Sequence, residues 1–338
     1  TRLVGSEMCI RDRIETTGSY MKEFNRNHRI NAVVGWSAEF NKDYYVSAGN
    51  NGFITDAFLW NSLQSGEGTK QVASGGSENK IYSAFARVGY TFMDRYLLTA
   101  TFRADGSSKF SKENRFSYFP SFAFAWRMNQ ENWLKNVEEI SNLKLRLGWG
   151  QVGNQAISPY STLQSYDIAT ASGADGSLAT GMIPGLIANP DLKWETSEQY
   201  NFGVDLGLFN QRLTMSIDAY IKNTKDLLQQ IALPNATGYN SMWINNGKIQ
   251  NKGLEFSVNA VALEKKHWNW TVGGNIAFAK NTIKELGMAP ADFGMLSGEV
   301  GYWGANVGNN TLTKFPANVF LVNRSIGLFM GYETEGIM

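Results

Sequence analysis

The sequence predicts an all-β protein, part of a transmembrane antiparallel β-barrel. Three observations support this prediction: apolar and polar residues alternate over long segments, these segments are longer than globular strands, and their connections alternate between short and long. No apolar run approaches the roughly 18 residues of a spanning helix. A barrel strand has one lipid-facing and one lumen-facing side, so the mean hydropathy of −0.28 is compatible with a membrane protein.

The composition argues against several classes of function. The 338 residues carry a net charge of +1, whereas a nucleic-acid binder needs a basic face. The single cysteine, Cys9, excludes a disulfide framework, and the two histidines, His28 and His267, leave little for a metal site. No common catalytic motif is present, so we expect no metal, no cofactor and no enzyme activity.

The first 13 residues are treated separately. Residues 4–13 (VGSEMCIRDR) resemble a translated sequencing-adapter remnant, and the alternative is a disordered tail. We therefore predict that residues 1–13 are an artefact or a tail, and that residues 14–338 are barrel. The last residues carry no terminating signal, and we interpret the chain as a fragment.

The strands follow from faces that alternate with a period of two. In chain order, the apolar faces run over residues 82–92, 98–102, 122–126, 200–208, 213–221, 254–262 and 270–278. The strands span about 9–13 residues, against about 5–6 for an average globular strand. At a tilt near 45°, about eleven residues rise roughly 25 Å, which is the height of an outer-membrane apolar band. We count about ten strands in all.

The connections separate two ends of the sheet. Short turns are expected at residues 93–95, 210–212 and 264–267. Long loops are expected at residues 49–80, 105–115, 151–196, 223–251 and after 280. Short periplasmic turns and long extracellular loops are typical of outer-membrane barrels. One connection differs, because Asn129 is placed to cap a short helix with Trp133, Val137 and Ile140 on one face.

Six loop and strand-edge strings follow one another along the chain, at residues 103–110 (RADGSSKF), 119–121 (FPS), 143–146 (LKLR), 189–195 (NPDLKWE), 251–255 (NKGLE) and 326–332 (IGLFMGY). Taken together and in this order, they resemble the SusC/RagA family of TonB-dependent outer-membrane transporters. From this resemblance we expect structural roles for a set of motif residues. They are Asp105, Gly106, Pro120, Gly153, Asn154, Asn189, Pro190, Trp194, Glu195 and Gly253.

The resemblance implies a 22-stranded barrel in the outer membrane of a Gram-negative cell, closed by an N-terminal plug. It implies import of oligosaccharides, glycans or peptides, powered through the plug by the TonB complex. It also implies a SusD-like surface lipoprotein as partner and outer-membrane lipid around the barrel. The plug, the N-terminal regions and the last strands are expected to lie outside this sequence.

Two sets of candidate functional residues remain. Aromatic side chains in the long loops are candidates for ligand contact: Trp60, Tyr160, Tyr239, Trp243 and Trp303. Polar residues on the predicted inner face are Arg103, Asp205, Asp218 and Glu255. Three alternatives stay open: a siderophore or cobalamin receptor, a secreted β-sandwich that binds glycans or acts as an adhesin, and a glycosidase using the acidic residues.

Overall fold

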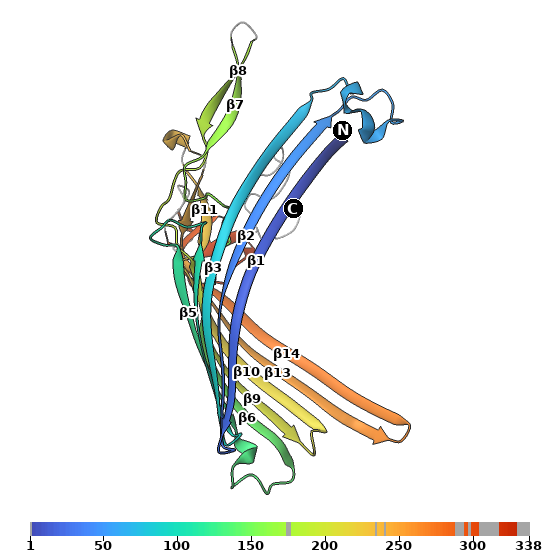
Figure 1. Ribbon diagram of the computed structural model, residues 1–338, viewed down its shortest axis with the longest axis vertical. Coiled ribbons are helices and arrows are strands. Elements are labelled where there is room, and N and C mark those ends of the chain that lie inside the picture. The colour runs from blue at the N-terminus through green and yellow to red at the C-terminus, as the bar shows by residue number, and fades with distance from the viewer. Residues whose placement is uncertain are drawn as a thin grey trace, which may run out of the picture.

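The computed structural model describes residues 2–173, 177–233, 235–239, 241–287, 294–296, 299–303 and 318–329. Its main feature is a sheet of ten antiparallel strands, strongly curved and hollow on one side (Figure 1). These strands are β1 (Arg2–Phe24), β2 (His28–Asn50), β3 (Gln71–Phe92), β4 (Tyr96–Ser107), β5 (Phe116–Arg127), β6 (Ile140–Asn154), β9 (Glu195–Leu208), β10 (Leu213–Lys225), β13 (Lys248–Lys265) and β14 (Trp268–Glu285). The predicted barrel class and strand number are confirmed.

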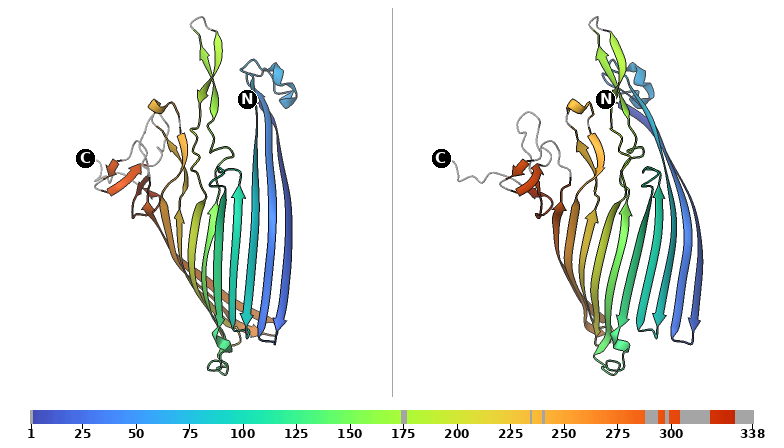
Figure 2. Two further views of the ribbon diagram at one scale, coloured as in Figure 1. Left: turned by 60° about the vertical axis from the view of Figure 1, so that its left-hand side comes forward. Right: turned by 90° about the vertical axis from the view of Figure 1, so that its left-hand side faces the viewer.

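The sheet is an open segment of a barrel wall. Each strand pairs with the next in the order β1-β2-β3-β4-β5-β6-β9-β10-β13-β14, so β1 and β14 form its two edges. Because the edges do not meet, the barrel is not closed within this chain (Figure 2). This single curved sheet differs from the two packed sheets of a β-sandwich, so the β-sandwich alternative is wrong.

The strands outside the ten-stranded sheet form small sheets at one of its ends. Hairpin β7 (Tyr166–Ser172) and β8 (Leu178–Pro184) projects beyond the strand ends, in the expected loop 151–196 (Figure 2). Hairpin β11 (Leu228–Ala232) and β12 (Ser241–Asn245) lies in the loop before β13. A four-stranded sheet follows β14, formed by β15 (Gly294–Leu296), β16 (Glu299–Trp303), β17 (Asn318–Leu321) and β18 (Leu328–Phe329).

The short turns all lie at the opposite end. Met93 and Asp94, between β3 and β4, both have positive φ angles, 52° and 54°, as the tightest hairpin turns require. The link from β9 to β10 and the link from β13 to β14 are similarly short. The expected separation of short turns from long loops is confirmed.

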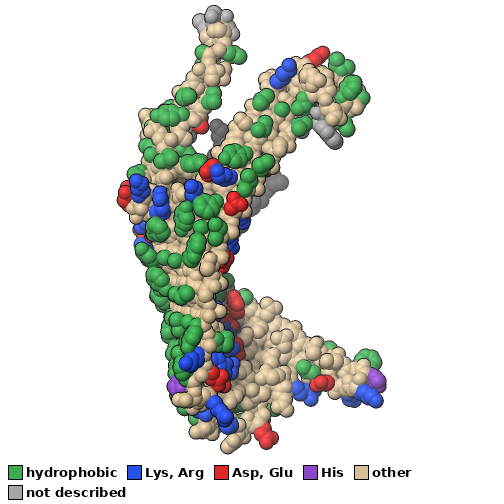
Figure 3. All heavy atoms as spheres, in the orientation of Figure 1, with side chains coloured by type: hydrophobic (Ala, Val, Ile, Leu, Met, Phe, Trp, Pro, Cys, Tyr) green, Lys and Arg blue, Asp and Glu red, His purple; other side chains and the backbone are tan. Residues whose placement is uncertain are grey.

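The two faces of the sheet differ in chemistry. On one face of β14, four large apolar side chains are exposed at 50–62%, and Gly274 takes the middle position. They are Trp270, Val272, Ile276 and Phe278. Large apolar side chains exposed over a whole face are expected where the solvent is lipid. In Figure 3, hydrophobic groups gather along the convex margin, and charged groups line the hollow side.

An aromatic row lies on the outer face at the short-turn end. The rings of Phe92, Tyr96 and Trp126 stack with centroids 6.2 Å apart at each step. Glu131, in the link between β5 and β6, accepts hydrogen bonds from Tyr96 Oη (2.6 Å) and Trp126 Nε1 (3.0 Å). These bonds, with the Arg95 guanidinium, hold the pKa of Glu131 below its usual range. The link is therefore fixed to the membrane-facing aromatic row.

The prediction of a helix that begins at Asn129 is wrong. The structure has a 3-10 turn, η2 (Met128–Gln130), followed by further turns up to β6. The Asn129 side chain donates to the Ser141 carbonyl (3.4 Å) instead of capping a helix, and Ile140 begins β6. No helix in the described part of the chain is long and apolar enough to cross a membrane.

Residues 2–13 lie in strand β1, paired with residues 39–50 of β2. The structure therefore places them in a strand and not in a disordered tail. Their pairing follows from the long β2, whose backbone groups need partners along its whole length. Their origin as an adapter remnant stays a prediction.

Candidate functional site: the inner wall and the loop rim

The inner wall carries a network of ion pairs across three neighbouring strands. Arg146 of β6 donates to both carboxylate oxygens of Asp205 on β9, at 2.9 and 2.8 Å. It also reaches Asp218 on β10, at 2.9 Å. Lys144 contacts Asp205 at 2.9 Å. The predicted inner-face residues Asp205 and Asp218 thus meet at one guanidinium, in the bidentate geometry that favours Arg over Lys.

Gly203 makes this network possible. It lies on β9 between Arg146 and Asp218 in the strand register. A Cβ atom at this position would lie 2.6 Å from Asp218 Oδ1 and 2.7 Å from Arg146 Cζ. A glycine is therefore required for the guanidinium to cross the β9 backbone and reach two strands at once.

Glu255 and Arg103 lie on the same inner face but outside this network. Glu255 is exposed and lies directly opposite Asp218 in the pairing of β10 with β13. Among the described residues, no cation forms an ion pair with Glu255. Arg103 donates from Nε to both oxygens of Asp105 (2.8 and 2.7 Å), and a terminal nitrogen donates to Ser83 Oγ (3.0 Å). The wall thus combines neutralised pairs with one exposed acidic position.

The loop rim has its own small hydrophobic core. Trp194 is 6% exposed and packs against Phe110 (centroids 5.3 Å apart) and Phe119 (5.8 Å). Its Nε1 donates to the Arg115 carbonyl at 3.0 Å. Leu192 is fully buried in the same cluster. Trp194 therefore joins the loop before β9 to the loop between β4 and β5.

Asparagine and glutamate side chains from the motif 189–195 connect this core to the next loop. Asn189 donates to the Trp243 carbonyl (2.7 Å), and Pro190 follows it in the turn. Glu195 accepts from the Leu228 amide (3.1 Å) and from Asn154 Nδ2 (3.2 Å). Two of these bonds satisfy backbone groups of the hairpin β11–β12, and the third joins two side chains. The motif holds three loops in one arrangement.

The remaining motif residues allow close packing or end a pairing. Gly106, Gly153 and Gly253 each face an aromatic ring, at 2.5, 2.0 and 2.4 Å from the position a Cβ would take. Pro120 lies in β5 next to Ser121, where the pairing with β6 stops. Its missing N–H is tolerated at such a position.

Three of the five candidate loop aromatics have described side chains. Tyr160 is 51% exposed, and its hydroxyl accepts from the Glu78 amide at 3.1 Å. The Tyr239 hydroxyl accepts from Gln164 Nε2 at 2.9 Å. Trp243 packs against the rim core, so it is mainly a packing residue. Trp60 lies in the 3-10 segment η1 (Leu59–Ser65) and Trp303 in β16, but their side chains are outside the described residues.

Two residues missed by the sequence analysis lie beside these tyrosines. Gln164 also donates to Tyr166 Oη at 3.1 Å, so it bridges Tyr166 and Tyr239. Tyr166 is 59% exposed at the start of β7. No sequence pattern predicts that Tyr166 and Tyr239 meet. They are 73 positions apart, and the folding of the loop hairpins brings them together.

A polar pocket of about 700 Å³ lies beside the motif loops. It is lined by amide groups, among them Asn114 and Asn189, and by charged groups. Lys193 pairs with Asp226 at 3.1 Å, and Lys248 pairs with Glu285. The lining combines many hydrogen-bond donors and acceptors with apolar surface from Met242 and Ile244. This combination can hold a polar ligand such as a sugar or a peptide backbone.

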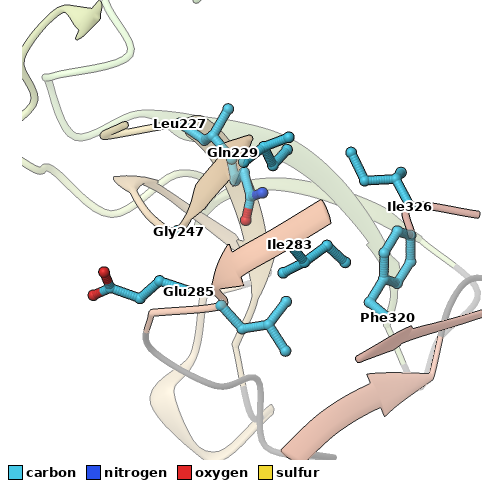
Figure 4. Close-up of a pocket in the computed structure, with 9 residues that line it drawn as sticks. Leu227, Gln229, Gly247, Ile283, Glu285, Phe320 and Ile326 are labelled. Atoms are coloured by element: carbon cyan, nitrogen blue, oxygen red, sulfur yellow. The ribbon is translucent and has the colours of Figure 1, made fainter. Parts of the chain in front are cut away.

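A second cavity, of about 60 Å³, lies beneath the loops that follow β14. Figure 4 shows apolar side chains from three segments around it, namely Ile283, Phe320 and Ile326, while the Glu285 carboxylate extends away from them. It holds one or two water-sized molecules at most, so we interpret it as imperfect packing. In the described residues, no group of three or more potential ligands is placed to hold a metal ion.

Comparison with known proteins identifies close similarities. The family model described as "TonB dependent receptor-like, beta-barrel" matches residues 10–326. TonB-dependent receptor P3 of Formosa agariphila is 34% identical over 94% of this chain and 31% of its own length. TonB-dependent receptor SusC of Bacteroides thetaiotaomicron is 36% identical over 74% of this chain and 26% of its own length.

Among solved structures, the RagAB peptide transporter superposes with a TM-score of 0.80. That match covers 97% of this chain and 34% of the matched chain at 23% identity, so it shows the fold. The chain spans less than a third of the length of these two curated relatives.

Proposed function

The chain belongs to the TonB-dependent receptor β-barrel family of the outer membrane, and from this premise we propose that it forms part of the wall of a TonB-energised importer. In this proposal the convex face contacts lipid, and the concave face lines the transport path. The long loops and their hairpins form the extracellular mouth. The complete barrel is proposed to hold a plug, through which the TonB complex acts.

The observation that carries this proposal is the contrast between the two faces of one sheet. Charged groups bridge three strands on the inner side, around Arg146. Large apolar groups alternate with them on the outer side, as at Tyr200 and Phe202 of β9, which are 48% and 45% exposed. A wall with this polarity separates an aqueous interior from lipid. Glu255 offers the interior an exposed carboxylate for a cationic group of the plug.

We propose oligosaccharides or peptides as the substrate class. The support is the polar pocket beside the motif loops and the pair of tyrosines bridged by Gln164. Exposed aromatic rings stack on the apolar faces of sugars and on peptide side chains. Tyr160, Tyr239 and Tyr166 are the proposed contacts, and Trp60 and Trp303 stay proposals from sequence. A SusD-like lipoprotein is the proposed partner at the mouth, since SusC is among the relatives.

The alternative in the same class is a siderophore or cobalamin receptor. We propose it second, because the loop motifs resemble the SusC/RagA group. We propose no catalysis by Asp205 or Asp218, because both carboxylates are paired with Arg146 as part of an ion-pair network that joins three strands.

The test is an uptake assay with the full-length transporter that carries this chain. We expect uptake of labelled oligosaccharides or peptides that stops when TonB is deleted and falls when the neighbouring SusD-like lipoprotein is removed. Uptake of a ferric siderophore instead would support the alternative. Equal uptake with and without TonB would overturn the proposal.

A further inference from the structure

Two lysines face one another on the lipid-facing side of the sheet. Lys252 on β13 and Lys280 on β14 are direct partners in the strand register. Lys252 lies two positions before Leu254, and Lys280 two positions after Phe278, so both point to the outer, apolar face. Both lysines are exposed.

This arrangement is unfavourable without a counter-ion. Like charges directly opposite each other on paired strands destabilise the pair. In the part of the chain that the structure describes, neither lysine joins an ion pair. The nearest carboxylate along β14, Glu285, is already paired with Lys248. Within the described part of this sheet, the two ammonium groups therefore have no counter-ion on the outer face.

The lysines lie where the outward side chains of their own strands change from apolar (Leu254 and Phe278) to polar (Gln250 and Thr282). The same register row runs from Lys252 to Ile221 on β10, then to Tyr200 on β9 and Trp149 on β6. Trp149 Nε1 and Tyr200 Oη both donate to Glu198, at 2.9 and 3.0 Å. Aromatic residues with a polar end are typical of the level where hydrocarbon meets headgroups.

An apolar groove opens on the outer face of the neighbouring strands, from β5 to β10. It has a volume of about 530 Å³ and is lined on the outer face by Phe122, Leu147, Trp149, Phe202, Ala219 and Ile221. Ala219 is the smallest outward side chain of β10 in this region, and its neighbours in the groove are large. Ile221, at the edge of the groove, is the direct partner of Lys252.

We propose that this surface binds a phosphate-bearing lipid of the outer leaflet, with the phosphate between Lys252 and Lys280 and an acyl chain in the groove over Ala219. Charge complementarity identifies the headgroup, and the apolar lining identifies the chain. The proposal rests on the outer-membrane placement of the barrel, but not on its substrate or on TonB. Lipid binding and uptake are therefore measured separately.

The test is native mass spectrometry of the full-length transporter with added lipid A that carries both phosphates. Each lysine near a membrane surface contributes about fivefold to the affinity for an anionic lipid. We expect Lys252→Gln with Lys280→Gln to raise the Kd about 25-fold. Ala219→Phe, which fills the groove without changing charge, is expected to weaken binding with both lysines intact.

Controls separate this site from general attraction. Lys222→Gln removes a charge from β10 on the opposite face of the sheet and is expected to leave lipid binding unchanged. Dephosphorylated lipid A is expected to bind the wild type as weakly as diphosphorylated lipid A binds the double variant. Inorganic phosphate at millimolar concentration is expected to leave the lipid bound, because it has no acyl chain. Unchanged binding by the double variant, or full displacement by inorganic phosphate, would overturn the proposal.

Discussion

At the scale of single residues, the inner wall depends on one missing side chain. Arg146 crosses the β9 backbone at Gly203 to reach Asp218, and this path is open because glycine has no Cβ. The surrounding atoms belong to charged groups with hydrogen bonds on several sides. They have little freedom to move away from a methyl group without losing those bonds.

Gly203→Ala is therefore expected to destabilise the full-length barrel by about 1–3 kcal/mol, the usual cost of overpacking. The measurement is the temperature at which heat-modified migration appears on a gel. Gly274→Ala is the matched control, because nothing lies within 4 Å of a Cβ at that position in β14. Equal transition temperatures for the two variants would show that the path of Arg146 over Gly203 does not contribute to the stability of the barrel.

A second residue-scale prediction concerns the rim core. Trp194→Ala removes the contacts with Phe110 and Phe119 and is expected to cost about 3–5 kcal/mol locally. Hydrogen exchange in residues 108–115 and 186–194 should then increase, while the central strands keep their protection. Trp133→Ala, at a position 63% exposed in the β5–β6 link, should leave exchange unchanged. If exchange in the loops does not change, Trp194 does not hold them.

At the scale of elements, the sequence located the strands but underestimated their length. The ten strands have 12–23 residues instead of about 9–13, and residues 71–80, expected in a loop, belong to β3. Alternation such as that of residues 200–208 specifies a strand because a slip of one residue would move every apolar group to the aqueous face. The projecting β7–β8 hairpin could not be predicted. Almost all of its residues are exposed, so burial imposes no alternation of apolar and polar residues on its sequence. The helix expected at Asn129 failed because Glu131 bonds to the aromatic row instead of supporting a helix.

The position of Glu131 predicts a pH dependence. Its pKa is lowered in the folded state by Tyr96, Trp126 and Arg95. The carboxylate therefore stabilises the fold at neutral pH, and this contribution disappears as the pH falls through the lowered pKa. We expect Glu131→Gln to lower the unfolding temperature at pH 7, with the difference from wild type shrinking below about pH 4.

Glu138→Gln, an exposed change in the same link, serves as the control for Glu131. Its unfolding temperature should match that of the wild type at every pH. A Glu131→Gln difference that stays constant from pH 7 to pH 3 would mean that the carboxylate charge is not what stabilises the link.

The site was only partly predictable from sequence. The inner-face residues Asp205 and Asp218 were identified because alternation assigns a face to each residue. Their common partner Arg146 was not, because β6 and β10 are separated by β9, and only the sheet order shows that one side chain spans three strands. In the same way, Gln164 and Tyr239 meet through loop folding that no local spacing encodes.

At the scale of the whole molecule, the sheet is one wall with two different ends. Loops and hairpins cluster at the end where β1, β2 and β3 extend beyond β4, and tight turns close the other end (Figure 2). Unpaired backbone groups of an edge strand cost several kcal/mol each in lipid. Because β1 and β14 are edges of this sheet, we expect stable insertion only within the full-length barrel.

The most direct test of the account is the orientation of this wall in the membrane. In a cysteine-free variant of the full-length protein, a single cysteine is introduced either at Lys112, in the long loop between β4 and β5, or at His267, in the turn between β13 and β14. With a membrane-impermeant maleimide, we predict that Lys112→Cys is labelled on intact cells and that His267→Cys is labelled only after the outer membrane is permeabilised. Labelling of both positions on intact cells, or of His267→Cys alone, would contradict the account.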